Sequence, residues 1–313
     1  MLAFISNIFG YLLNFLYELV NNYGIAIILF SILLRIILLP ITIKQQKSVE
    51  KTNKIQGQLK ALQIKYKNNP EMLNKETMEL YKREKISPAS GCLSGIIQII
   101  IILSVFFLVS QPLTYMKKAN DTNPDLKSVV DSYKTEITEN KESKTRYIEI
   151  EAIARMRDDY KNITEKLNSG NLAEGESKEE LENKKNNLEK LNINMDFMQL
   201  DLSKVPNENK NDFKVYIIPA LYVLSSFISI KLTTAIQNKA KKKKEENKEE
   251  NEMDNMAQMS KSMSYMMIFT TLFVAFIAPL GLALYWFISN VLMIGERLVI
   301  NKIVEKKEAD GNE

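Results

Sequence analysis

Histidine and cysteine form most catalytic triads, metal cages and redox pairs, and this chain contains almost none of either. Its 313 residues include no histidine and one cysteine, Cys92. A histidine-dependent triad, a histidine or cysteine metal cage, a CxxC pair and an internal disulfide are therefore excluded. Neither GxxxxGK(S/T) nor GxGxxG occurs, which argues against a phosphate-binding loop. We expect no enzymatic activity, no cofactor and no metal.

One charged residue stands inside an apolar stretch that is suited to lipid. Arg35 lies in ILLRIILLP, which runs from Ile32 to Pro40. An arginine at mid-span costs about 2.5–3.5 kcal/mol on insertion scales. Arg35 is about 12 Å from the end of its helix, and snorkelling covers only part of that distance. Because a guanidinium does not deprotonate at neutral pH, Arg35 can attract an anion or a carboxylate but cannot act as a base.

The other apolar stretches offer no carboxylate at the depth of this arginine. Glu296 falls close to one end of its own stretch. A buried salt bridge is therefore not expected, and water must reach the guanidinium of Arg35. Two classes of function remain: a transporter or channel for small anions, and a chaperone-like site for acidic polypeptide.

Three further polar or aromatic residues can share this wet space. Ser31 lies one turn before Arg35 on the same helix face. Gln98 opens the next apolar stretch, and Trp286 lies in LYWFISN, Leu284–Asn290. The alternative for Ser31 and Gln98 is an ordinary interhelical hydrogen bond, and for Trp286 a place in an interfacial aromatic belt.

Five membrane-spanning helices are predicted to position these residues. The apolar stretches 24–43, 95–115, 215–236 and 262–300 are long enough, since a span needs about 20 residues. The last stretch is about twice that length, and APLG at Ala278–Gly281 predicts a hairpin turn between two spans. The predicted fold class is an all-α polytopic membrane protein.

The distribution of lysine and arginine predicts the orientation of the spans. Basic residues outnumber acidic ones in 44–92 and form the run KAKKKKEENK in 237–261, so both loops are expected in the cytoplasm. Acidic residues outnumber basic ones in 116–214, which is expected outside. With five spans, the N-terminus is outside and the C-terminus is cytoplasmic, as in a multi-pass protein of the bacterial inner membrane.

Residues 1–22 are predicted to form an amphipathic helix that lies on the outer leaflet. Polar residues recur every three or four positions on an otherwise apolar helix: Asn7, Tyr11, Asn14, Glu18 and Asn21. The alternative is a sixth span, in which Glu18 and the asparagines would be costly. A signal peptide is disfavoured because the segment lacks a basic start.

The segment 44–92 is predicted to be a helical hairpin. An apolar stripe recurs at helical spacing over Ile55, Leu59, Leu62 and Tyr66. KNNPE then ends this helix and suits the first turn of the next one. Because a simple spacer would not need such order, we expect a docking or regulatory role.

The remaining polar segments have simpler interpretations. In 116–214, two charged helices flank SGNLAEGES, and apolar positions are too sparse to predict a substantial core, which indicates an accessory cap or a partly disordered insertion. The basic run in 237–261 is expected to bind anionic lipid and not nucleic acid.

The expected segments are an interfacial helix at 1–22, the first span at 23–43, the cytoplasmic hairpin at 44–92, the second span at 93–115, the extracytoplasmic helical insertion at 116–214, the third span at 215–236, the basic loop at 237–261, the fourth and fifth spans at 262–279 and 280–300, and the cytoplasmic tail at 301–313.

Three motifs, in this order, resemble the YidC family of membrane protein insertases, which includes mitochondrial oxidase-assembly and chloroplast relatives. YGIAIILFSILLRIILLPITIKQQKS (Tyr23–Ser48) resembles the stretch in which the family has an arginine followed by a P-L-x-x-K-Q type ending. ELYKREKISPASGCL (Glu79–Leu93) is close to LYKxxKxNPxxGC, and PLGLALYWFISN (Pro279–Asn290) is close to PxGLxLYWxxSN.

The resemblance implies spans that enclose a hydrophilic groove, open to cytoplasm and lipid and closed outside. The family's groove arginine matches Arg35, and its groove positions on the second and fifth spans fall on Gln98 and Trp286. In that family the groove attracts the acidic tail of a substrate, and the cytoplasmic hairpin receives nascent chains. Two prolines common in the family are replaced here by Ser94 and Ile100, which predicts a straighter second span.

The resulting hypothesis is an insertase and chaperone that inserts and folds nascent membrane proteins, alone or with the Sec translocon. The expected partners are nascent membrane proteins, the Sec translocon, the ribosome, the signal-recognition machinery and anionic lipids, with no direct binding of nucleic acid. The alternative, a small-anion transporter or channel, predicts internal repeats, and the sequence contains no evident repeat.

Overall fold

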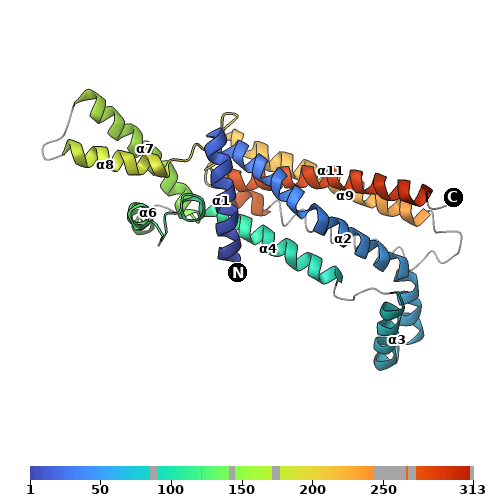
Figure 1. Ribbon diagram of the computed structural model, residues 1–313. Helices are drawn as coiled ribbons and strands as arrows, with labels where there is room; N and C mark the ends of the chain where they lie inside the picture. The colour runs from blue at the N-terminus through green and yellow to red at the C-terminus, as the bar shows by residue number, and fades with distance from the viewer. Residues whose placement is uncertain are drawn as a thin grey trace. The chain divides into compact units, whose positions relative to one another are not determined.

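The computed structural model describes residues 1–84, 90–120, 122–140, 145–170, 177–242, 266 and 273–310. The chain divides into two compact units: the first unit is Met1–Leu33 with Ser104–Glu313, and the second unit is Leu34–Leu103. The helices are α1 (Leu2–Val20), α2 (Tyr23–Lys65), α3 (Pro70–Arg83), α4 (Ser90–Ser110), α5 (Pro112–Tyr115), α6 (Pro124–Glu139), α7 (Ile148–Ser169), α8 (Lys178–Leu191), η1 (Phe213–Tyr216), α9 (Ile217–Lys242) and α11 (Leu280–Asp310) (Figure 1). A two-stranded antiparallel hairpin pairs β1 (Asp196–Phe197) with β2 (Leu200–Asp201). The predicted all-α class is confirmed.

Within the residues that the structure describes, four helical segments are long and apolar enough to cross a membrane. They are Leu2–Val20, Tyr23–Lys44, Phe213–Ala235 and Leu280–Ile300, and Ile99–Ser110 of α4 is a shorter apolar helix. The length of α1 suits either expectation for residues 1–22. Most of the predicted fourth span, 262–279, lies outside the described residues, and the chain leaves helix at Ala278 and Pro279 before α11 begins. The chain is a polytopic membrane protein.

Helix α2 continues well beyond the first predicted span. It includes Pro40 and runs without a break to Lys65. Lys and Gln are the commonest residues between Lys44 and the end of α2, and because both favour helix and no proline follows Pro40 there, the helix continues. In the second unit, Ile55 of α2 packs with Leu80 of α3, and Leu59, Leu62 and Tyr81 surround this pair. At the start of α3, Asn69 accepts a hydrogen bond from the backbone N–H of Met72.

The segment 116–214 contains a core of its own, so the expectation of too few apolar positions was wrong. The two helices expected to flank SGNLAEGES are α7 and α8, which form a helical hairpin, and α6 packs against both of them (Figure 1). Each helix supplies only one narrow apolar stripe, but the three stripes face one another. The buried residues include Leu126, Val130, Tyr133 and Ile137 of α6, Ile150, Ile153, Met156 and Ile163 of α7, and Leu188 and Leu191 of α8.

Helices α9 and α11 lie side by side along much of their length (Figure 1). Tyr222 of α9 meets Trp286 of α11, and Ser226 further along α9 meets Asn290 further along α11. Because the contacting residues advance in the same direction on both helices, the two helices run parallel.

Candidate functional site

The four predicted site residues fall in both units. Arg35 on α2 and Gln98 on α4 belong to the second unit, whereas Ser31 on α2 and Trp286 on α11 belong to the first. The Gln98 side chain lies outside the described side chains. A site formed by all four residues therefore stays a prediction.

Arg35 lies at the edge of the buried stripe of α2. Its neighbour Leu34 is 5% exposed, Ile36 on the other side is 61% exposed, and Arg35 itself is half-buried. Arg35 also has a polar or electrostatic interaction within the chain, so it is not the isolated charge that the sequence suggested. Half-burial still leaves part of this side chain accessible from outside the protein.

Ser31 is buried and satisfied by its own helix. It is 1% exposed, and its hydroxyl donates to the carbonyl of Ile27 at 2.7 Å. This bond within α2 differs from the interhelical bond that was the alternative for Ser31. The hydroxyl binds the preceding turn, as serine and threonine often do within membrane helices.

Trp286 packs against α9 and lies next to a polar network. Its ring centroid is 6.1 Å from that of Tyr222, with the planes tilted by 39°. One turn further along α11, the Asn290 amide donates to the hydroxyls of Ser225 and Ser226, each at 3.0 Å. Sequence reasoning missed both serines, although a Ser-Ser pair in the middle of an apolar span was a visible signal.

The N-terminal part of α2 lies against the start of α11 within the first unit. The rings of Phe30 and Tyr285 are 6.5 Å apart. A methyl group on Gly281 would lie 3.4 Å from the Tyr23 ring and 3.7 Å from the Ile27 side chain. These are ordinary contact distances, so α11 begins in van der Waals contact with α2 without requiring a glycine at this position.

A segment that sequence analysis did not single out covers this junction. We call residues 192–209 the outer strap. Asn194 uses all of its polar groups: its backbone N–H donates to the Tyr17 hydroxyl at 2.8 Å, and its side-chain amide donates to the Asn21 carbonyl at 3.1 Å. Its carbonyl accepts from the Tyr23 N–H at 2.9 Å, and its side-chain oxygen accepts from the Asp196 N–H at 3.1 Å. The strap thereby fixes the bend between α1 and α2.

The outer strap also holds the start of α11. The N–H groups of Leu280 and Gly281 donate to the carbonyls of Lys204 and Leu202 at 2.9 and 3.0 Å. The first N–H groups of a helix have no partners within the helix, and here the strap carbonyls satisfy two of them. Phe197 packs so closely on Gly24 that a methyl group there would lie 2.4 Å from its ring. The strap therefore covers the first turns of α2 and α11.

A buried carboxylate ties α6 and α7 to α5, which lies at the end of the second predicted span. Glu149 in the first turn of α7 is 3% exposed. It accepts hydrogen bonds from the N–H of Thr114 at 3.0 Å, the Thr114 hydroxyl at 2.5 Å and the Lys134 ammonium at 2.7 Å. Thr114 lies on α5 and Lys134 on α6, so one side chain joins three helices.

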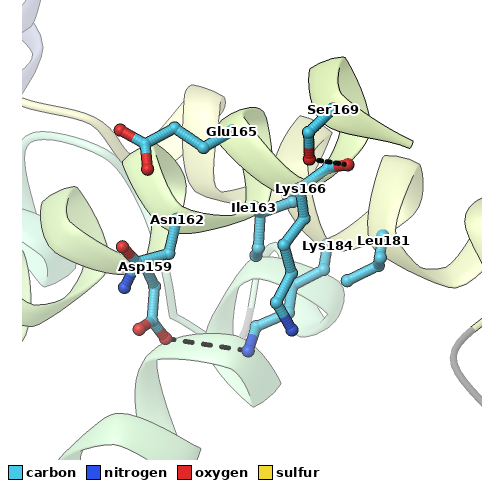
Figure 2. Close-up of a pocket in the computed structure, with 8 residues that line it drawn as sticks. All are labelled: Asp159, Asn162, Ile163, Glu165, Lys166, Ser169, Leu181 and Lys184. Atoms are coloured by element: carbon cyan, nitrogen blue, oxygen red, sulfur yellow. Dashed lines mark hydrogen bonds and ion pairs between the residues drawn. The ribbon is translucent and has the colours of Figure 1, made fainter. Parts of the chain in front are cut away.

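An open hollow of about 640 Å³ lies between α7 and α8 (Figure 2). Two acidic and two basic side chains line it, Asp159, Glu165, Lys166 and Lys184. Lys184 forms an ion pair with Asp159 at 3.7 Å. Because these charges balance, the hollow offers no preference for an anion or a cation. In the same region, burial and the bond to Asp159 hold the pKa of the Tyr133 phenol above its usual range.

Comparison with known proteins covers most of the chain. A family model described as 60Kd inner membrane protein matches residues 15–308. A protein named Membrane protein insertase YidC from Fusobacterium nucleatum is 44% identical over 97 residues, which are 31% of this chain and 47% of that protein. A protein of the same name from Francisella tularensis subsp. novicida is 41% identical over 109 residues, 35% of this chain and 20% of that protein.

The chain spans about half the length of the first of these relatives and about a fifth of the second. The family model includes every motif on which the resemblance rests, from Tyr23 to Asn290. The resemblance is thereby confirmed, and the chain belongs to the 60Kd inner membrane protein family, which includes the YidC insertases.

Proposed function

We propose that this protein is a membrane protein insertase and chaperone of the bacterial inner membrane. The observation that carries the proposal is the family match over residues 15–308, together with relatives named as insertases. The protein would receive a nascent membrane protein from the cytoplasmic side and release its apolar segment into lipid. It would work alone or beside the Sec translocon.

Arg35 would attract the acidic, polar tail of such a substrate. It is half-buried on α2, next to exposed apolar residues such as Ile36 and Ile37. Moving polar groups from water into hydrocarbon is costly unless they find partners. A hydrated groove with a fixed positive charge lowers this cost, and burial of the substrate's apolar segment, at about 25 cal/mol per Å², supplies the driving force.

The helical hairpin of the second unit would receive nascent chains from the ribosome or the signal-recognition machinery. Ile64 on α2 and Met78 on α3 are exposed apolar side chains in a basic, polar segment. Exposed apolar side chains on a solvated helical hairpin are suited to binding a partner helix. The basic run of 237–261 would bind anionic lipid headgroups.

The proposal is tested by insertion of a single-span substrate with an acidic tail into proteoliposomes that contain the purified protein. Arg35→Ala should reduce insertion by about tenfold, equivalent to about 1.4 kcal/mol of lost charge attraction. Arg35→Lys should retain most of the activity, because the positive charge remains. Lys44→Ala, at an exposed position on the same helix, is the matched control and should insert as the parent does.

Equal insertion by the parent and by Arg35→Ala would remove Arg35 from the mechanism. Insertion no better than in empty liposomes would overturn the insertase proposal as a whole. A parallel assay of anion flux in the same liposomes addresses the alternative, since flux that is insensitive to substrate would identify an anion channel or transporter.

A further inference from the structure

The parallel pair α9 and α11 is held in one register by a series of side-chain contacts. Thr233 and Arg297 are 64 residues apart, as are Ser226 and Asn290. Tyr222 and Trp286 share this separation. A constant offset along two parallel helices means that each contact supports the same alignment of the helices.

The polar contact at Asn290 is continuous with the aromatic contact at Trp286. Asn290 lies one turn after Trp286 and on the same helix face. Its amide donates to Ser225 and Ser226, and these two hydroxyls donate in turn to the carbonyl of Tyr222 at 2.8 and 2.9 Å. Tyr222 is also the residue whose ring meets Trp286. The chain of bonds therefore begins one turn from the indole and ends at the backbone of its aromatic neighbour.

Burial makes this network a strong constraint. Asn290 is 8% exposed and Ser225 is 5% exposed, so neither can exchange its partner for water without moving. Side-chain bonds between membrane helices have few competing partners in the surrounding lipid. Trp286 itself is only half-buried, so close packing does not enclose its indole on every side.

We propose that Asn290 is a positioning residue that holds the Trp286 indole against Tyr222 through Ser225 and Ser226. The positioning itself does not depend on the function proposed above. Its consequence does: if Trp286 contacts substrate, then Asn290 sets the orientation in which the indole meets that substrate.

The sequence provides a direct probe, because Trp286 is the only tryptophan in the chain. Its intrinsic fluorescence in the full-length protein, reconstituted in lipid nanodiscs, reports the environment of this indole alone. Asn290→Leu removes the amide at similar volume and suits an apolar surrounding. It should shift the emission maximum and increase quenching by acrylamide, while Asn290→Gln, which keeps the amide, should restore the parent values in part.

Two further variants separate positioning from a general loss of structure. The double variant Ser225→Ala/Ser226→Ala removes the partners of Asn290 on the other helix and should give the same change in emission. When the double variant is combined with Asn290→Leu, the emission should change no further, since all three residues act in one chain of hydrogen bonds. Val291→Ala, at an exposed position next to Asn290, is the matched control and should leave the emission unchanged.

Unchanged emission and quenching in Asn290→Leu would overturn the proposal. If Asn290→Leu does not fold, unchanged emission and quenching in the double variant Ser225→Ala/Ser226→Ala would overturn the proposal instead. Crosslinking from position 286 to a stalled nascent chain then tests the consequence. A shifted emission with unaltered insertion would leave Asn290 as a positioning residue whose effect on the indole does not influence insertion. The absence of any crosslink from position 286 would remove Trp286 from the proposed insertion mechanism.

Discussion

Glu149 illustrates how the packed helices α5, α6 and α7 bury a full charge. Three donors from two other helices, α5 and α6, surround its carboxylate. Its place in the first turn of α7 adds the favourable end of the helix dipole. At the residue scale, this one side chain connects α5, α6 and α7 more directly than any pattern in the sequence indicated.

Glu149→Ala should lower the free energy of unfolding of the purified protein in detergent by about 2 kcal/mol, because the Thr114 N–H loses its partner while Lys134 can reach water. Thermal unfolding followed by circular dichroism measures this change. Glu136→Ala is the matched control, since Glu136 is 66% exposed and Arg155 keeps its bond to Glu151. Equal decreases in the melting temperature for both variants would show that the buried carboxylate stabilises the fold no more than the exposed one does.

Asp212, just before η1, is expected to make the stability of the folded protein depend on pH. The Lys204 ammonium at 2.7 Å and the Lys214 N–H at 3.1 Å hold the pKa of this carboxyl below its usual value of 3.8. A lowered pKa in the folded state means that the carboxylate contributes stability above pH 3.8, which is lost as the pH falls through the lowered value.

Asp212→Asn should therefore unfold at a lower temperature than the parent at neutral pH, and the difference should shrink as the medium becomes more acidic than pH 3.8. Lys204→Met should reproduce this loss. Melting curves of the three proteins between neutral and acidic pH provide the measurement, and a difference that persists unchanged in acid would exclude the charge as its source.

At the scale of elements, close backbone contact decides how α1 packs. A methyl group on Gly10 of α1 would lie 2.0 Å from the carbonyl oxygen of Tyr115 on α5. Only a glycine can allow the two helices to approach so closely. Lys118 reinforces this contact, because its ammonium lies 3.7 Å from the centre of the Tyr11 ring and donates to Asn7.

Gly10→Ala should displace α1 and lower the melting temperature, because neither backbone can yield without losing its hydrogen bonds. Gly295→Ala on α11 is the control, since an added methyl group meets nothing within 4 Å there. It should be neutral or stabilising by up to about 1 kcal/mol through helix propensity. A similar decrease in the melting temperature of both variants would contradict the tight packing of α1 on α5.

At the scale of the whole molecule, the topology predicted from basic residues can be tested directly. In a Cys92→Ser background, Met198→Cys in the outer strap should react with a membrane-impermeant maleimide added to intact cells. Met78→Cys in the helical hairpin should react only after the cells are permeabilised. Both native side chains are exposed, so access to the reagent depends on the side of the membrane. Labelling of position 78 in intact cells would show that the protein has the opposite orientation to the predicted one.

Several parts of this molecule could be predicted from the sequence alone. Long apolar runs determined the helical membrane class, because a chain in lipid must satisfy its backbone hydrogen bonds within each segment. Local signals also sufficed for the end of the helix before Pro70, the apolar face around Ile55 and the family motif around Trp286. These features depend on neighbours within one or two turns.

Only the tertiary structure revealed the core of α6–α8, the outer strap, the Glu149 contacts and the serines that bind Asn290. Each of these joins residues far apart in the chain, such as Thr114 with Glu149 or Ser225 with Asn290. No single stripe on α6, α7 or α8 was wide enough to predict a core, because its partner stripes lie on other helices. Periodicity reports which face of a helix is apolar, whereas the identity of what covers that face depends on long-range packing.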